Sequence, residues 1–192
     1  MINPTWVKRF NQPPTRTASS RIIQSWDPGG DNHWSVCVTL LLQDHKHYLL
    51  HVLRDRMRYS MLVARAIAHA TRILVEHALI GPALVAELQK AGLPAVMIKP
   101  EGDKQTRMAI QSAKFESGQV FFPNQAAWLA EFEHEVFGFP NGRYNDQVDA
   151  LSQALAHGKP SYELSDESNE GFRKFVNDLW WHNQLMGRLG GY

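Results

Sequence analysis

The spacing of apolar residues changes character about a third of the way along the chain. Apolar and β-branched residues fill three strand-like runs, at 21–27, 34–42 and 47–54. The first run ends at Pro28-Gly29-Gly30, a turn that neither a strand nor a helix tolerates in its interior, and polar residues 43–46 separate the other two. This pattern predicts that the fold opens with a three-stranded antiparallel meander.

From Ser60 onward, helical spacing alternates with short apolar runs. Helices are predicted from Ser60 to before Ile73, over 82–91, from the loop at 102–107 to about Gly118, over 125–137 and over 146–156. Short strands are predicted over 73–76, 95–98 and 120–122. Three antiparallel strands followed by alternating helices and strands predict an α/β fold with a mixed sheet flanked by helices. Right-handed crossovers would bring the ends of the strands at 21–27 and 73–76 side by side.

The two ends of the chain differ from this central pattern. Residues 1–20 contain adjacent prolines and a Thr/Ser cluster, and they are predicted to form an extended lead-in. Residues 21–158 form the predicted domain. Residues 159–192 turn polar and acidic and then aromatic, which predicts a tail whose helix packs back or docks on a partner.

Composition narrows the class of protein only a little. A chain of 192 residues with 44% hydrophobic residues is long and apolar enough for one folded domain. A formal net charge of +1 gives no overall nucleic-acid signature, so any DNA-binding surface must arise from local clustering of charge. The single cysteine, Cys37, is expected to be a core residue in a reducing compartment. Neither a membrane span nor a signal peptide is recognisable, which predicts a cytoplasmic protein.

Acidic residues stand at the places where such a fold would bring them together. Asp27 closes the first strand, Glu76 closes the strand at 73–76, and Asp146 and Asp149 lie three positions apart on one face of the last predicted helix. Clustered carboxylates raise each other's pKa unless a cation neutralises them, and oxygen ligands select Mg²⁺ or Mn²⁺. Two such ions about 3.5–4 Å apart can hydrolyse a phosphodiester. The alternative is that Asn145 and Asp146 simply cap the helix, while Asp149 suits its dipole.

These residues sit within a longer pattern that resembles a known family. The pattern consists of Ser25-Trp26-Asp27-Pro28, Trp34-Ser35-Val36, Ile73-Leu74-Val75-Glu76, Lys99-Pro100, Asp103-Lys104, Arg107, Phe139-Pro140-Asn141-Gly142 and Asp146-Gln147-Val148-Asp149-Ala150-Leu151. It resembles the C-terminal nuclease domain of tailed-phage terminase large subunits, in register from about residue 21 to 157. The closing motif is the most specific part.

The resemblance implies an RNase H-like fold and two-metal cleavage of concatemeric viral double-stranded DNA during genome packaging. It also implies that Asp27, Glu76 and Asp149 are the ligands and catalytic carboxylates for two Mg²⁺ or Mn²⁺ ions, with Asp146 as a fourth. The implied partners are double-stranded DNA, the terminase ATPase domain, the small terminase subunit and the portal, in the host cell cytoplasm. No Gly-x-x-x-x-Gly-Lys-Ser/Thr stretch occurs in these 192 residues, so the ATPase is expected in a separate domain or chain.

The chain departs from the family pattern at three places. His33 replaces a common acidic residue, His77-Ala78 replaces an acid followed by Lys, and Tyr144-Asn145 replaces His-Asp before Asp146. His33 can ligate a metal as a neutral imidazole or serve as a polar loop residue. Loss of the Lys removes a cation near the site and can reduce activity. The three main carboxylates are retained.

Basic residues near the expected carboxylate edge are candidates for contacts to the DNA backbone. They are Lys99, Lys104, Arg107 and Arg143, together with the alternating set Arg54, Arg56 and Arg58 after the third strand. A solvated charged surface, or an edge strand that deters aggregation, is the simpler alternative for these residues. Two other functions also fit the pattern: an RNase H-like junction resolvase, and a non-catalytic module that docks on DNA or a portal.

Overall fold

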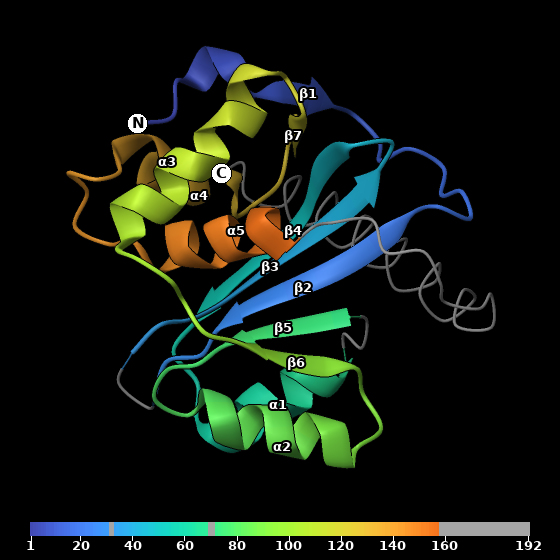
Figure 1. The fold of residues 1–192 in the computed structure, drawn as a ribbon, viewed down its shortest axis with the longest axis vertical. Helices are drawn as coiled ribbons and strands as arrows, with labels where there is room; N and C mark the ends of the chain where they lie inside the picture. Colours follow the sequence, from blue (N-terminus) through green and yellow to red (C-terminus); the bar gives the residue numbers. More distant parts are fainter. Residues whose placement is uncertain (31–32, 69–71, 158–192) are drawn as a thin grey trace, which may run out of the picture.

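The computed structural model describes residues 1–30, 33–68 and 72–157, which form one mixed sheet with helices on both faces (Figure 1). The strands within these residues are β1 (Lys8–Phe10), β2 (Arg21–Asp27), β3 (Ser35–Gln43), β4 (Lys46–Asp55), β5 (Arg72–Glu76), β6 (Ala95–Ile98) and β7 (Val120–Pro123). The helices are a 3₁₀ turn (Pro4–Trp6), α1 (Tyr59–Ala68), α2 (Gly81–Lys90), α3 (Lys104–Glu116), α4 (Leu129–Gly138) and α5 (Asp146–His157). The strand order is β1-β7-β4-β3-β2-β5-β6.

The pairing of the strands confirms the predicted fold class. β2, β3 and β4 form the antiparallel meander, and β5, β6, β7 and β1 pair in parallel with their neighbours. β5 lies directly beside β2, as the sequence predicted. The ends of β2 and β5 therefore share one edge of the sheet.

Two apolar cores, one on each face, follow from the two-residue period of the central strands. On β3, Val36, Val38 and Leu40 face the core beneath α3, α4 and α5, whereas Cys37 faces the core beneath α1 and α2. Figure 1 shows these two groups of helices on opposite sides of the sheet. Trp26, at 0% exposure, belongs to the second core, so it is a packing residue, as is Cys37.

The first twenty residues differ from the predicted extended lead-in. β1 pairs in parallel with β7 and extends the sheet at that edge, and Ile2 and Val7 are buried in the core on the α5 side. A three-residue strand is too short to leave an alternating pattern in the sequence, which explains why the prediction missed it. The predicted tail at 159–192 lies outside the described residues. No helix in the described part of the chain is both long and apolar enough to cross a membrane.

A buried histidine on β4 makes the fold sensitive to acid. His47 is 4% exposed, and neither ring nitrogen has a hydrogen-bond partner within the described structure. Burial, helped by the charge of Lys114, lowers its pKa from 6.5 to about 4. The native state therefore holds this imidazole neutral at pH values where the unfolded chain takes up a proton.

We expect the free energy of unfolding to fall as the pH drops from 6.5 to about 4, because only the unfolded chain binds a proton there. The loss attributable to His47 is roughly 2–3 kcal/mol. Urea unfolding at several pH values should show this loss in the wild type and in the exposed control His134→Gln, and a smaller loss in His47→Leu. Identical pH profiles for wild type and His47→Leu would contradict the assignment.

Candidate active site at the ends of two parallel strands

Two carboxylates end neighbouring parallel strands. Trp26 of β2 pairs with Val75 of β5, so Asp27 and Glu76, the next residues along each strand, leave the sheet at the same edge. Both are partly buried, and neither forms an ion pair with any described residue. The predicted juxtaposition of these two strand ends is therefore present.

Each of these strand ends is followed by a glycine that approaches another backbone closely. A Cβ atom on Gly29 would lie 2.3 Å from the carbonyl oxygen of Trp34, and one on Gly81 would lie 2.1 Å from the carbonyl oxygen of Glu76. Any side chain at either position would displace the backbone beside the carboxylates. Glycine at these two positions thus permits the close approach of the backbone beside the strand ends.

Helix α5 brings the third carboxylate to this edge. The side chain of Gln153 donates a hydrogen bond from Nε2 to Oγ of Ser25 on β2 (3.0 Å), which fixes the helix against the strand. Asp149 lies one turn earlier on the same helix face and is 3% exposed. The packing of α5 on β2 therefore directs Asp149 toward the ends of β2 and β5.

Asp149 is held by two cations from α3. Arg107 donates from Nη2 to Oδ1 of Asp149 (2.7 Å), and Lys104 forms an ion pair with Oδ2. Lys104 also donates to Oδ1 of Asn145 (2.8 Å), and Arg107 donates to the carbonyl oxygen of Gly102 (2.9 Å). Both basic residues come from the loop and helix start that the sequence placed near the site.

The protonation equilibria show that the carboxylates interact. Burial is the largest cause that raises the pKa of Asp27, and the charges of Glu76, Asp149 and Asp146 add to it; against a smaller opposing effect of Lys104, the pKa reaches about 8. Burial and the charge of Asp149 also raise the pKa of Glu76. Asp27 is therefore close enough to the other three acidic residues to be affected by their charges, and Glu76 is close enough to be affected by that of Asp149.

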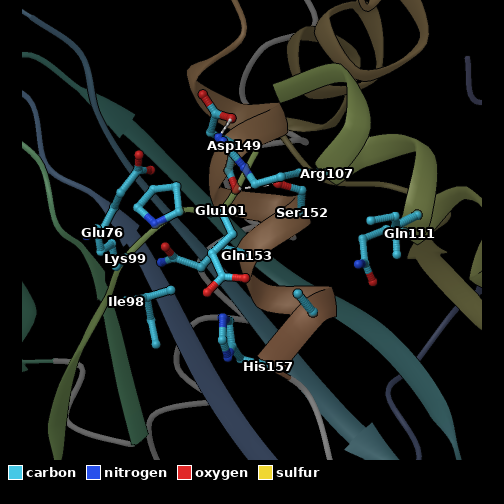
Figure 2. Close-up of a pocket in the computed structure, with 13 residues that line it drawn as sticks. Glu76, Ile98, Lys99, Glu101, Arg107, Gln111, Asp149, Ser152, Gln153 and His157 are labelled. Atoms are coloured by element: carbon cyan, nitrogen blue, oxygen red, sulfur yellow. Dashed lines mark hydrogen bonds and ion pairs between the residues drawn. The ribbon is translucent and has the colours of Figure 1, made fainter. Parts of the chain in front are cut away.

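A cavity of about 310 Å³ opens beside the carboxylates. Glu76, Asp149 and Arg107 all line it, and Arg107 contacts Asp149 there (Figure 2). Its remaining wall combines apolar Ile98 with polar and charged side chains, including exposed Lys99. The cavity gives solvent and ligands access to the carboxylate edge.

The donor set fits hard divalent cations. Carboxylate oxygens from β2, β5 and α5 are ligands that Mg²⁺ and Mn²⁺ prefer, and the raised pKa of Asp27 reflects a carboxyl group that is buried close to other acids. Among the described residues, no three His, Cys, Asp or Glu side chains are grouped tightly enough to hold a metal, and Asp149 is engaged by Lys104 and Arg107. Binding of a metal would therefore require Asp149 to exchange or share these partners.

The first turn of α5 is capped in an unexpected way. Glu135 of α4 accepts hydrogen bonds from the backbone N–H and the side-chain Nε2 of Gln147, both at 2.7 Å. The side-chain oxygen of Asn145 instead accepts from Lys104. The side chain that caps the first turn of α5 is thus Glu135 of α4, and not Asn145 or Asp146. Glu135 was not among the residues predicted from the sequence. Its position three residues after the core residue Phe132, on the apolar face of α4, is the signal that could have identified it.

The remaining candidate residues differ in their exposure and their contacts. Arg54 is mostly buried and ion-paired with Glu131, while exposed Arg56 and Arg143 lie over the rings of Trp34 (4.6 Å) and Tyr144 (5.2 Å). Arg56 and Arg58 follow the end of β4, so the predicted stripe of alternate residues along one strand is interrupted. His33 is exposed in the loop after β2, where its backbone N–H donates to Gly30.

The protein is thus a mixed α/β domain with acidic residues at two adjacent parallel strand ends and on a helix packed across them. The family model described as the Terminase RNaseH-like domain matches residues 24–157, and the chain belongs to this family. No curated protein sequence matches the chain.

Solved structures show the same RNase H-like fold. The large terminase nuclease of the thermophilic phage G20c with bound magnesium has a TM-score of 0.61 at 17% identity, covering 80% of this chain and 94% of that chain. The P22 large terminase nuclease domain has a TM-score of 0.57 at 15% identity, covering 93% and 94%. The manganese-soaked human cytomegalovirus terminase nuclease domain has a TM-score of 0.58 at 14% identity, covering 83% and 96%.

We expect Asp27→Asn to stabilise the metal-free protein at neutral and alkaline pH. The pKa of Asp27 is about 8 in the native state and 3.8 in the unfolded chain, so between these pH values the native state keeps a proton that the unfolded chain releases. The free energy of unfolding therefore falls as the pH rises from about 3.8 to about 8. The Asn variant avoids this loss, with a gain of at least about 1 kcal/mol at pH 8.5. Urea unfolding in EDTA at pH 5, 7 and 8.5 measures the gain, with the exposed Asp44→Asn as control. A gain that does not grow with pH would argue against the buried, repelled carboxylate.

Proposed function

We propose that the protein is a metal-dependent endonuclease that cuts concatemeric viral double-stranded DNA during genome packaging. The observation that carries this proposal is the gathering of Asp27, Glu76 and Asp149, with Asp146 beside them, at one sheet edge in a chain of the terminase nuclease family. The similar G20c structure contains bound magnesium and the cytomegalovirus structure was soaked with manganese, which supports a divalent cofactor.

The site residues would divide the work as follows. Asp27, Glu76 and Asp149 would hold two Mg²⁺ or Mn²⁺ ions, with Asp146 as a further ligand. When bound, such ions activate a water and stabilise the leaving oxygen of a phosphodiester. Lys104 and Arg107 orient Asp149 by direct contact, and their charges lie where a phosphate approaching the carboxylates would need neutralisation. The cavity beside Glu76 and Asp149 admits the substrate.

Contacts to DNA would be made through the phosphate backbone. Lys99 and the two cations of α3 flank the carboxylates on one side, and Arg56 and Arg143 are exposed beside Trp34 and Tyr144. Neither Arg56 nor Arg143 forms an ion pair with a described residue, which leaves their N–H donors available to phosphates. Arg58, two residues after Arg56, is also exposed. Binding of this kind positions a strand without reading its sequence.

The proposal extends to the biological setting, which family membership supports. The ATPase domain of the large terminase, the small terminase subunit and the portal would be the partners, and the host cell cytoplasm would be the place of action. The nuclease would then cut DNA that the motor has engaged.

A non-catalytic DNA-binding role is the alternative that one observation favours. Both oxygens of Asp149 are engaged by Lys104 and Arg107, an arrangement that neutralises the carboxylate without a metal. A module of this kind would bind DNA with no dependence on divalent cations.

We expect purified protein to nick and linearise plasmid DNA with Mn²⁺ or Mg²⁺ but not with EDTA. Asp27→Ala and Asp149→Asn should each lower the rate at least about 100-fold, because each removes a ligand of the metals. Glu133→Gln, which alters an acid away from the site, is the matched control. Intact plasmid with wild type at every metal concentration, or equal cleavage by Asp27→Ala, would exclude the nuclease proposal and leave the binding module.

We expect Arg56→Ala with Arg143→Ala to weaken binding to duplexes of any sequence. Each phosphate contact contributes about 0.9 to the slope of log affinity against log salt, so the double variant should flatten that slope by about 2. Fluorescence anisotropy of a labelled duplex in EDTA measures this without cleavage, with the exposed Lys90→Ala as control. An unchanged slope would remove these two residues from the DNA surface.

A further inference from the structure

A buried carboxylate controls the first turn of α5. Glu135 is 6% exposed, and its two oxygens accept the backbone N–H and the side-chain Nε2 of Gln147, each at 2.7 Å. Backbone N–H groups in the first turn of a helix have no partner inside the helix, and a side chain just before the helix usually supplies one. Here the side-chain oxygen of Asn145 accepts from Lys104. The start of α5 is therefore fixed by α4.

Arg54 compensates the charge of this cap. Its side chain is 8% exposed, its Nη2 lies 3.9 Å from Oε2 of Glu135, and its Nη1 forms an ion pair with Glu131. The guanidinium also lies 4.2 Å from the ring centre of Trp34 and 4.8 Å from that of Tyr144. A buried carboxylate without such compensation would be strongly destabilising. Arg54 thus connects the end of β4 to the cap and to the loop before α5.

The capped residue lies between the two acidic residues of α5. Gln147 follows Asp146 directly and precedes Asp149 by two positions, so both carboxylates move if this first turn frays or rotates. A helix turns about 100° per residue, so a small change in where the helix begins points Asp146 and Asp149 away from the strand ends. Precise placement of metal ligands depends on such supporting contacts.

We propose that Glu135 and its counter-ion Arg54 are positioning residues that set the start of α5 so that Asp146 and Asp149 meet Asp27 and Glu76. This inference rests on the proposed metal-dependent function. In this proposal Arg54 supports the position of α5 and does not contact the DNA backbone.

The test compares Mn²⁺ affinity, measured by calorimetry at a temperature where circular dichroism shows each variant folded, with hydrogen exchange at the amide of Gln147. Glu135→Ala should weaken Mn²⁺ binding at least about 10-fold and accelerate that exchange. Glu135→Gln keeps an oxygen that can accept from the N–H of Gln147, so it should restore most of the affinity. Glu133→Gln, on the same helix and paired with Arg9 at 2.6 Å, is the matched control.

Arg54→Lys keeps the charge but loses the planar guanidinium, and it tests the proposal if Glu135→Ala does not fold. We expect it to weaken Mn²⁺ binding about 3- to 10-fold. If Glu135→Ala is folded and binds Mn²⁺ as tightly as the wild type, the positioning role is overturned. If Glu135→Ala is unfolded, wild-type Mn²⁺ affinity in Arg54→Lys overturns it. The nuclease proposal stands in both cases. A wild-type protein that binds no Mn²⁺ overturns the nuclease proposal and the positioning role together.

Discussion

The parallel hydrogen-bonded pairing of β2 with β5 is the constraint on which the candidate site depends. It places the last residue of each strand at one edge of the sheet, and in this chain both residues are acidic. Partial burial and mutual repulsion raise the pKa of Asp27 and of Glu76, so the fold carries a cost there that packing alone does not require. Such a cost is expected where charge is kept for binding a cation.

The rest of the molecule acts to hold a third element across that edge. Gln153 fixes α5 against β2, Glu135 caps its first turn, and Lys104 and Arg107 hold Asp149. These contacts join α5 to three other elements, β2, α3 and α4, so the site depends on the packing of α3, α4 and α5 over the sheet. Because Asp149 is paired with two cations, its charge is compensated without a metal, whereas Asp27 and Glu76 have no cation paired with them among the described residues.

The sequence predicted those parts of the fold that depend on the spacing of apolar residues and on turn residues between the elements. The meander, the buried parallel strands and the helices between them follow from two-residue and helical spacing, and Asp27 and Glu76 were placed because each closes a strand. β1 was missed because three residues carry too little pattern. The cap by Glu135 and the burial of Arg54 were missed because they depend on which helices meet, a tertiary property that spacing along the chain does not encode. Neither family resemblance nor periodicity distinguished Arg54 from its exposed neighbour Arg56.

A crystal structure of the protein soaked in Mn²⁺, with the metal located by anomalous scattering, tests the central claim most directly. The account expects two Mn²⁺ ions between Asp27, Glu76 and Asp149, with Lys104 or Arg107 withdrawn from the carboxylate of Asp149. An absence of anomalous peaks at this edge, with both cations still bound to Asp149, would contradict it.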